Sequence, residues 1–183
     1  MEMKLKDVLR EKKPAILKRW FDVILETYPA ETADFLKGQK DRFTGPVGYT
    51  IYEGIDALID GLIEEMPLEK ASPFLDSIIR IRAVQDFSPS QAVAFIFQLK
   101  RIIREELMDE AHGTLDAGAL SAFESKIDAL ALVSFDIYMK CREKIYELKA
   151  NEARNMTFRL LQRANQLYGI QEQGPNVETT NLK

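Results

Sequence analysis

The sequence predicts an all-α protein that consists of a single helical domain and a long C-terminal helix. Apolar residues recur in steps of three and four along most of the 183-residue chain, as they do on the buried face of a helix. Serine–proline pairs and other helix-start signals separate these periodic segments. No segment shows the strict alternation of apolar and polar residues that is typical of a half-buried strand.

The first helix is predicted to begin at Leu5 and to end at Pro29. Pro14 lies within it, at a point where either a kink or a fresh first turn is tolerable. A short helical piece at residues 32–37 then leads into a loop, 38–45, which is mostly polar.

The next helix is predicted to start with Thr44 as its N-cap and Pro46 in its first turn. Gly48, Gly54 and Gly61 lie along it. An interior glycine costs about 1 kcal/mol relative to alanine, so we expect a compensating feature. The expected compensation is a close crossing with another helix.

Two further helices are predicted to start at serine–proline pairs. Ser72 and Pro73 open one of them. Ser88 begins the other, where a proline follows and Gln91 stands at the right distance to complete a capping box. The segment 92–97 is apolar on every face, which predicts that this helix lies in the middle of the fold.

A long final helix is predicted to follow, with Asp116 as its cap. Its apolar residues form a heptad-like seam, which lapses at residues 149–155. We expect the distal part of the seam, at Tyr138, Cys141, Ile145 and Leu148, to contact a second copy or another partner. The whole seam consists of Leu120, Phe123, Ile127, Leu130, Ser134, Tyr138, Cys141, Ile145 and Leu148.

These patterns divide the chain into three parts. Residues 1–148 form the helical domain, and residues 149–173 form a helical extension. Residues 174–183 are polar and are predicted to be a disordered tail.

Composition argues against nucleic-acid binding and membrane insertion. The 25 basic and 29 acidic residues give a net charge of −4, and the basic residues near the start are interleaved with acidic ones, which favours a solvated helix face over a membrane-surface patch. The charged N-terminus does not resemble a signal peptide, and no apolar run approaches the roughly 20 residues of a membrane span. With Cys141 as the single cysteine, the sequence predicts a cytoplasmic protein.

The sequence indicates no enzyme and no cofactor. Cys141 and His112, the single histidine, are far apart along the chain, so a catalytic dyad is not predicted. A haem would need an axial histidine on an apolar helix, and His112 lies in a predicted loop. One loose acidic cluster matches no metal-ligand spacing, so no metal site is predicted. It consists of Glu106, Asp109, Glu110, His112 and Asp116.

One polar cluster precedes the central helix, and it allows two interpretations. Arg82 and Asp86 are four residues apart, so they can pair on a helical turn and fix a corner between two helices. Alternatively, the cluster is the polar end of a small effector pocket in which Arg82 meets an anion. The candidate residues are Arg80, Arg82, Gln85 and Asp86, with Tyr49 and Tyr52 as further polar groups.

Three stretches resemble the N-terminal domain family of the RsbRD-type stressosome co-antagonists. The most distinctive is RIRAVQDFSPSQAVAFIFQLK, residues 80–100. The segment 16–20 is similar to the opening helix of that family, and 46–49 with the following Glu53 and Gly54 is similar to its second block. The resemblance covers about residues 5 to 140.

The resemblance implies a helical, sensory input domain of bacterial signalling proteins, which typically precedes an output module such as a STAS domain or a histidine kinase. The related RsbR proteins have a globin-like fold without haem. The periodicity alone leaves open a globin-like packing or a simpler helical bundle. The family has no established catalytic residues, so none are carried over to this chain.

Only a short tail follows the final predicted helix, so we expect the domain to act in trans. The leading hypothesis is a stand-alone signalling sensor or regulatory domain, a homodimer that acts through protein–protein contacts and responds to an unknown small-molecule effector. The alternative is a non-catalytic accessory subunit that docks on a larger enzyme complex.

Overall fold

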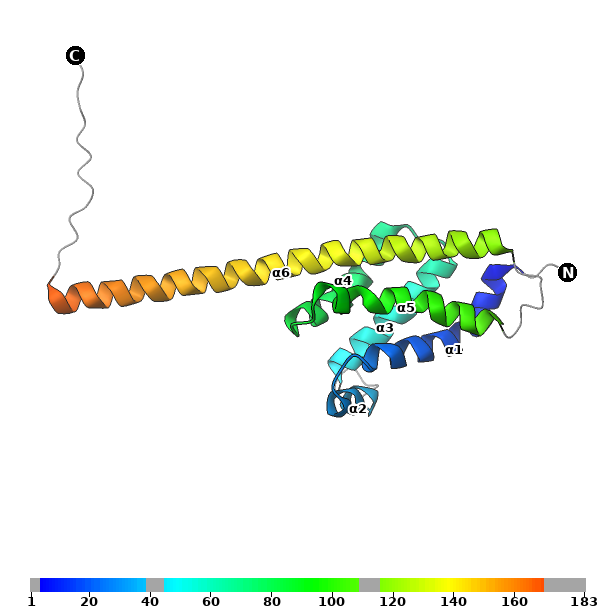
Figure 1. Cartoon of the computed structure of the whole chain (residues 1–183), viewed down its shortest axis with the longest axis horizontal. Coiled ribbons are helices and arrows are strands. Elements are labelled where there is room, and N and C mark those ends of the chain that lie inside the picture. Colours follow the sequence, from blue (N-terminus) through cyan, green and yellow to red (C-terminus); the bar gives the residue numbers. More distant parts are fainter. Residues whose placement is uncertain (1–3, 39–44, 109–115, 170–183) are drawn as a thin grey trace, which may run out of the picture. The chain divides into compact units, whose positions relative to one another are not determined.

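A computed structural model describes residues 4–38, 45–108 and 116–169 of the chain. These residues form six helices and no strand, which confirms the all-α prediction. The chain divides into two compact units, 1–142 and 143–183, a boundary slightly earlier than the one expected from the sequence. The helices, labelled in Figure 1, are α1 Leu5–Leu25, α2 Ala30–Gly38, α3 Pro46–Ile63, α4 Leu68–Val84, α5 Pro89–Met108 and α6 Ala117–Tyr168.

Two helix starts differ from the prediction. The helix α4 begins at Leu68, with Pro67 as N-cap, rather than at Ser72. Pro73 lies inside α4, past its first turn, where its missing N–H leaves out one backbone hydrogen bond of the helix. The helix α3 has Gly45 as N-cap, while Thr44 lies outside the described residues.

Other local signals were interpreted correctly. Pro46 occupies the first turn of α3. Asp116 precedes α6, and its Oδ1 accepts a hydrogen bond from the N–H of Gly118 at 2.8 Å, which is the predicted cap. Pro14 lies within α1, which runs without interruption from Leu5 to Leu25 and therefore contains no second start.

The close helix crossing expected at the α3 glycines is present at Gly54. A Cβ atom at this position would lie 2.8 Å from Cδ1 of Ile78 and 3.5 Å from the carbonyl oxygen of Phe74, both on α4. The approach to Phe74 is an ordinary contact, but real Cβ atoms do not come as close as 2.8 Å, so any side chain here would force Ile78 to shift. Glycine therefore favours the close packing of α3 against α4.

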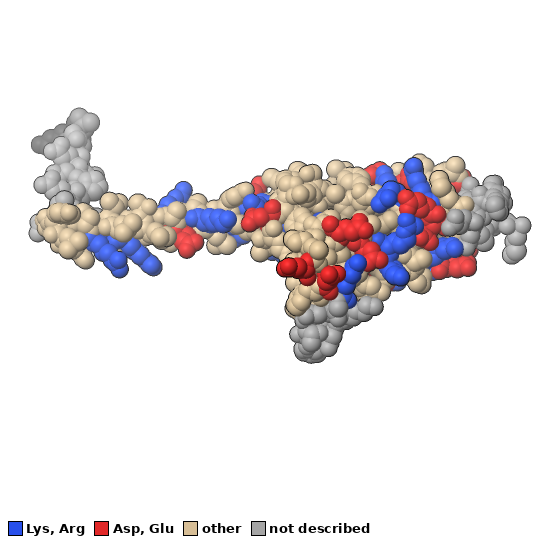
Figure 2. Space-filling model, turned by 60° about the horizontal axis from the view of Figure 1, so that its bottom comes forward, with Lys and Arg blue, Asp and Glu red and all other residues tan. Residues whose placement is uncertain are grey.

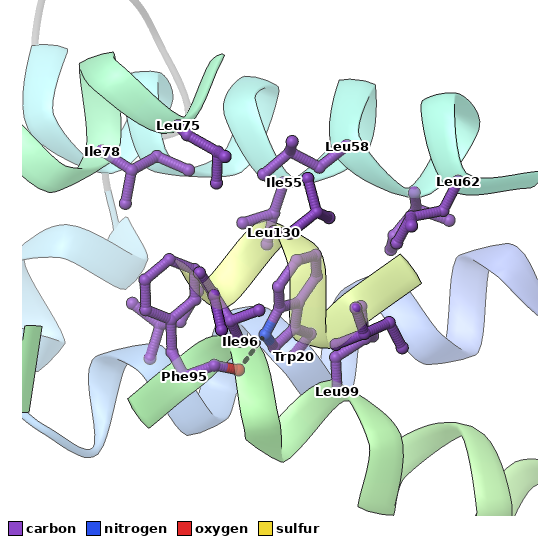
Figure 3. Close-up of a cluster of buried hydrophobic side chains, with 14 of the residues drawn as sticks. Trp20, Ile55, Leu58, Leu62, Leu75, Ile78, Phe95, Ile96, Leu99 and Leu130 are labelled. Atoms are coloured by element: carbon purple, nitrogen blue, oxygen red, sulfur yellow. Dashed lines mark hydrogen bonds between the residues drawn. The ribbon is translucent and has the colours of Figure 1, made fainter. Parts of the chain in front are cut away.

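The core of the first unit is built around Trp20 (Figure 3). This side chain on α1 is completely buried, stacks on Phe95 with ring centroids 5.8 Å apart, and donates a hydrogen bond to the Phe95 carbonyl oxygen at 2.7 Å. The predicted central segment of α5 is largely buried, although Phe97 is about half exposed. Isoleucine and leucine side chains from α3, α4 and α6 close the core.

The first half of the predicted α6 seam packs inside the chain. Phe123, Ile127, Leu130, Ser134 and Tyr138 are all buried in the first unit. The expectation that Tyr138 belongs to a seam with a partner is therefore wrong, because its side chain is already covered by the same chain.

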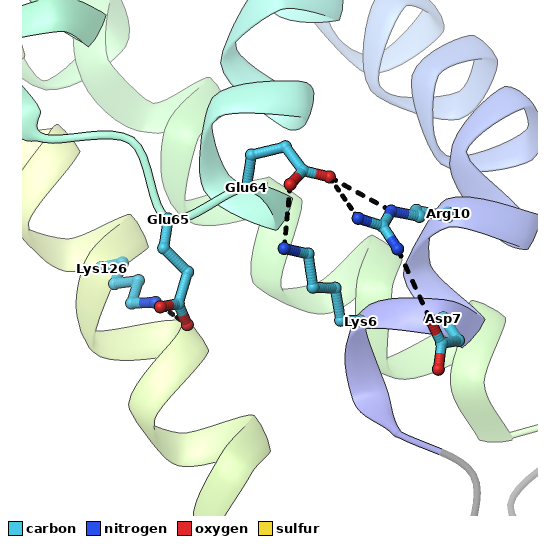
Figure 4. A network of polar contacts seen from close by, with 6 residues as sticks. All are labelled: Lys6, Asp7, Arg10, Glu64, Glu65 and Lys126. Atoms are coloured by element: carbon cyan, nitrogen blue, oxygen red, sulfur yellow. Dashed lines mark hydrogen bonds and ion pairs between the residues drawn. The ribbon is translucent and has the colours of Figure 1, made fainter.

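Ion pairs join the helices of the first unit. Figure 4 shows Glu64, after α3, accepting from Lys6 and Arg10 of α1, and Glu65 accepting from Lys126 of α6. Lys13 of α1 likewise contacts two aspartates of α3 at 2.7 Å. The basic N-terminal residues thus face carboxylates of neighbouring helices, and the face shown in Figure 2 mixes both signs.

The pair Arg104–Glu124 connects α5 to α6, which lie side by side in Figure 1. The two hydrogen bonds from Arg104 lower the pKa of Glu124, whose carboxylate is 12% exposed. Because the folded state prefers the charged form, the pair stabilises the fold above pH 4.5, the ordinary pKa of a glutamate. That stabilisation is lost as the pH falls through the lowered pKa.

We therefore expect Glu124→Gln to lower the free energy of unfolding by about 1 kcal/mol at pH 7. Urea titrations at several pH values should show that the difference in unfolding free energy between the wild type and the variant disappears in acid. The control is Glu152→Gln, which changes an exposed glutamate in the second unit. A difference that stayed constant down to pH 3 would contradict the assignment.

None of the six described helices combines the length and the hydrophobicity that crossing a bilayer requires.

Candidate functional site

The turn between α4 and α5 carries Gln85 and Asp86 of the predicted polar cluster, and Arg82 lies in the last turn of α4. The helix α4 ends at Val84, and the N–H of Gln85 donates to the carbonyl oxygen of Ile81 at 3.1 Å. Asp86 then adopts a left-handed backbone conformation with φ of 59°, which few residues other than glycine adopt readily. This residue turns the chain away from the helical path, so that Phe87 lies against Tyr28, in the segment between α1 and α2.

The predicted capping box closes the turn. The N–H of Ser88 donates to Oε1 of Gln91 at 3.0 Å, and the N–H of Gln91 donates to Oγ of Ser88 at 3.3 Å. Both ends of the box are therefore satisfied, and the start of α5 is held in place.

Arg82 lies beneath this turn with a side chain that is 0% exposed. Its Nη2 donates to Oγ1 of Thr27 at 3.1 Å and to the carbonyl oxygen of Gln91 at 3.0 Å. Its Nε and Nη1 have no hydrogen-bond acceptor. Burial lowers the pKa of this guanidinium from its ordinary value.

The predicted ion pair between Arg82 and Asp86 is wrong. The carboxylate of Asp86 instead accepts from Nη1 of Arg142 on α6, at 2.8 Å. The rule for residues four apart applies only while the helix continues, and α4 ends before Asp86. The left-handed conformation then places the carboxylate near α6 rather than near the preceding turn.

Two other residues of the cluster have separate partners. Oε1 of Gln85 accepts from the hydroxyl group of Tyr28 at 3.0 Å, so Gln85 remains part of the corner. Arg80 lies on an exposed part of α4 and pairs with Asp76 at 2.5 Å. Arg80 therefore takes no part in the contacts around Arg82.

Tyr49 and Tyr52 belong to a different cavity. This cavity has a volume of about 510 Å³ and lies among α1, α2 and α3. The ring of Tyr52 meets that of Phe21 edge-on at 5.4 Å. The predicted candidate residues thus lie in three places: the corner around Arg82, this cavity, and the exposed face of α4 that carries Arg80. The cavity is lined by Lys18, Phe21, Asp22, Leu36, Lys37, Gly48, Tyr49, Tyr52 and Glu53.

Two side chains of α6 hold the turn between α4 and α5. The hydroxyl group of Tyr138 donates to the carbonyl oxygen of Phe87. Arg142, the last residue of the first unit, donates to the carbonyl oxygen of Ala83 at 3.0 Å as well as to Asp86. The turn that covers Arg82 is therefore attached directly to α6.

The remaining seam residues differ in exposure. Cys141 is partly buried against the core, and this burial raises the pKa of its thiol. Ile145 is partly buried, and Leu148 is exposed.

Within the described residues, no three His, Cys, Asp or Glu side chains come together in a group that fits a metal ion. Of the acidic cluster considered above, Glu106 pairs with Arg19 at 2.6 Å and Asp116 caps α6. Asp109, Glu110 and His112 lie outside the described residues.

The sequence did not identify the residues that surround Arg82. Its guanidinium carbon lies 4.2 Å from the ring centroid of Phe87, 5.5 Å from that of Phe95 and 5.6 Å from that of Tyr28. Phe95 belongs to the apolar segment 92–97, which was predicted only to be buried. No local pattern links the end of α4, the turn after it and the segment between α1 and α2, so this arrangement appears only in the folded chain.

The fold and this corner together define an all-α domain that buries an arginine under a turn attached to its last helix. The chain belongs to the family described as the RsbT co-antagonist protein rsbRD N-terminal domain, whose model matches residues 14–153. This match confirms the resemblance seen in the sequence and extends into the second unit. The family is a regulatory signalling domain family, and membership implies a stressosome-related signalling role.

The chain is also similar to an uncharacterized protein of Archaeoglobus fulgidus. The two are 27% identical over 142 residues, which cover 75% of this chain and 82% of the relative. No solved structure matches the chain.

Proposed function

We propose that this protein is a non-catalytic regulatory signalling domain that acts through protein–protein contacts, and that its immediate partner is a second copy of the same chain. Family membership supports the signalling role. The observation that carries the proposed contact is the apolar surface of the second unit.

The helical part of the second unit, residues 143–168, exposes far more large apolar side chains than a solvated helix needs. Leu167 is 82% exposed and Leu160 is 63% exposed. Apolar surface of this extent marks an interaction site on a soluble helix. The exposed residues are Tyr146, Leu148, Met156, Phe158, Leu160, Leu161, Leu167 and Tyr168.

Part of this surface forms a stripe with the spacing of a coiled coil. Its residues alternate steps of four and three, the repeat that keeps a seam facing a second helix. Leu148 follows Tyr146 by two residues, so it lies on the other side of the helix from the stripe. We define the α6 stripe as Tyr146, Ala150, Ala153, Thr157, Leu160, Ala164 and Leu167.

A second copy is the occupant that suits the α6 stripe. Small residues (Ala150, Ala153, Thr157 and Ala164) lie between the large ones, so two such helices can approach closely along the stripe. Charged residues of both signs flank the stripe, among them Glu147, Lys149 and Arg154, as at the edges of coiled-coil interfaces.

The test is the association state of the full chain by sedimentation equilibrium. We expect a dimer, and we expect Leu160→Asp with Leu167→Asp to raise the dissociation constant at least 100-fold, roughly 3 kcal/mol. The control is Gln162→Asp with Gln166→Asp, which introduces the same residues on another face of the same helix.

Circular dichroism should show that both double variants keep the helical content of the first unit. A monomeric wild-type chain would contradict the proposed dimer. So would a control variant that dissociates as readily as the leucine variant.

A further inference from the structure

Arg82 carries a positive charge inside the first unit, with no carboxylate of the described residues paired with it. The side chain is completely buried and forms no ion pair with any described residue. A buried cation normally faces a carboxylate or another anion, because the loss of hydration is otherwise not offset.

Its hydrogen bonds are also incomplete. A guanidinium group carries five N–H donors. Nη2 uses its two on Thr27 and Gln91, while Nε and Nη1 have no acceptor. Three N–H groups thus remain unused inside the protein, where water does not reach them.

Three aromatic rings surround the guanidinium without removing this deficit. The ring of Phe87 is the nearest, with its centroid 4.2 Å from Cζ, and Phe95 and Tyr28 are more distant. Ring faces attract a cation, but they do not replace an oxygen acceptor for its N–H groups.

A surface depression of about 380 Å³ lies at the same corner of the fold, although Arg82 itself does not line it. Three of its lining residues, Tyr28, Phe87 and Gln91, are the same residues that contact Arg82. Phe87 is partly exposed, lines the depression and lies against the guanidinium. A ligand in the depression would need this side chain to rotate in order to reach Arg82. The other lining residues are Pro29, Thr32, Gln85 and Asp86.

We propose that the depression and Arg82 together form a binding site for a small organic carboxylate. The carboxylate oxygens accept from Nε and Nη1 of Arg82, and the apolar part of the ligand packs against Tyr28, Pro29 and Phe87. Charge-assisted hydrogen bonds of this kind are the strong ones in proteins. This proposal is independent of the proposed dimer.

The surroundings favour a carboxylate over a more highly charged anion such as phosphate. Arg142, the second arginine near the turn, is already paired with Asp86. Asp86 also lines the depression, and the repulsion between its carboxylate and a ligand grows with the negative charge of the ligand. The apolar walls favour a ligand that has an apolar body.

The test uses benzoate as a probe and measures its binding to the full chain by isothermal titration calorimetry at constant ionic strength. We expect one saturable site, with benzamide, the neutral analogue, binding at least tenfold more weakly. Acetate and inorganic phosphate should each bind at least tenfold more weakly than benzoate.

The Arg82→Met substitution should raise the dissociation constant for benzoate at least tenfold, because methionine fills similar space without charge. Arg80→Met is the matched control, since it removes an exposed arginine of the same helix, and it should bind benzoate as the wild type does. As a second measurement that needs no variant at the site, the Nε–H resonance of Arg82 in the wild-type chain should shift as benzoate saturates.

Several outcomes would overturn the proposal. One is the absence of binding at about 10 mM benzoate, well above the dissociation constant of a weak millimolar site. Equal affinity for benzoate and benzamide would show an apolar groove rather than an anion site. Phosphate or acetate binding as tightly as benzoate would reject the organic carboxylate, and an unshifted Arg82 resonance would place the probe elsewhere.

Discussion

Trp20→Ala is expected to lower the free energy of unfolding by about 4 to 5 kcal/mol, and so to remove much of the stability of the first unit. Trp20 is completely buried and stacks on Phe95. The substitution leaves a large cavity in the core of the first unit and removes the hydrogen bond to the carbonyl oxygen of Phe95. Urea denaturation followed by circular dichroism measures this loss.

Two control variants separate the causes of this loss. Trp20→Phe keeps part of the side-chain volume but loses the hydrogen bond. We expect it to lower the free energy of unfolding by about half as much as Trp20→Ala does. Phe35→Ala removes a large aromatic side chain that is 60% exposed, so it should change the stability by less than about 1 kcal/mol. A comparable loss from Phe35→Ala would contradict the central role of Trp20.

Gly54→Val is expected to lower the free energy of unfolding by about 2 kcal/mol. The new Cβ would lie 2.8 Å from Cδ1 of Ile78, which is itself completely buried and has little room to move. Overpacking of this kind forces side chains or helices apart, and the cost exceeds the small gain from replacing an interior glycine.

The cause can be tested by combining Gly54→Val with Ile78→Ala. If the contact with Ile78 is responsible, the stability losses of the two single variants should not add. The double variant should be at least 1 kcal/mol more stable than their sum predicts, roughly the coupling energy found between residues in contact. Glu53→Val is the control, because it introduces the same side chain at an exposed position of α3. Strict additivity would contradict the close-crossing explanation for Gly54.

The turn between α4 and α5 contacts both the proposed carboxylate site and α6. Phe87 covers Arg82, and the carbonyl oxygen of the same residue accepts from Tyr138 of α6. Arg142 holds the adjacent Asp86. The side chains that would respond to a ligand at Arg82 are therefore in direct contact with the helix that we propose pairs with a second copy.

Short-range signals in the sequence predicted the helices well, because the groups involved are only a few residues apart. The capping box of Ser88 and Gln91, the cap at Asp116 and the first-turn position of Pro46 each depend on local hydrogen bonds or on one backbone angle. The signal at Ser72 and Pro73 misled, since a proline is also tolerated slightly further inside a helix.

Signals of this kind did not predict the contacts around Arg82. The spacing of Arg82 and Asp86 predicts a pair only if the helix reaches Asp86, and it ends two residues earlier. The rings around the guanidinium come from the segment between α1 and α2, the turn after α4, and α5, so their meeting depends on how three parts of the chain pack.

Periodicity alone established that the chain is helical and which residues form apolar stripes, because the 3.6-residue repeat is a property of the chain itself. It did not establish what covers each stripe. The seam of α6 is one continuous pattern in sequence, yet Tyr138 is buried by its own chain while Leu148 is exposed. Burial is a property of the assembled helices, so the partner of each stripe follows only from tertiary packing.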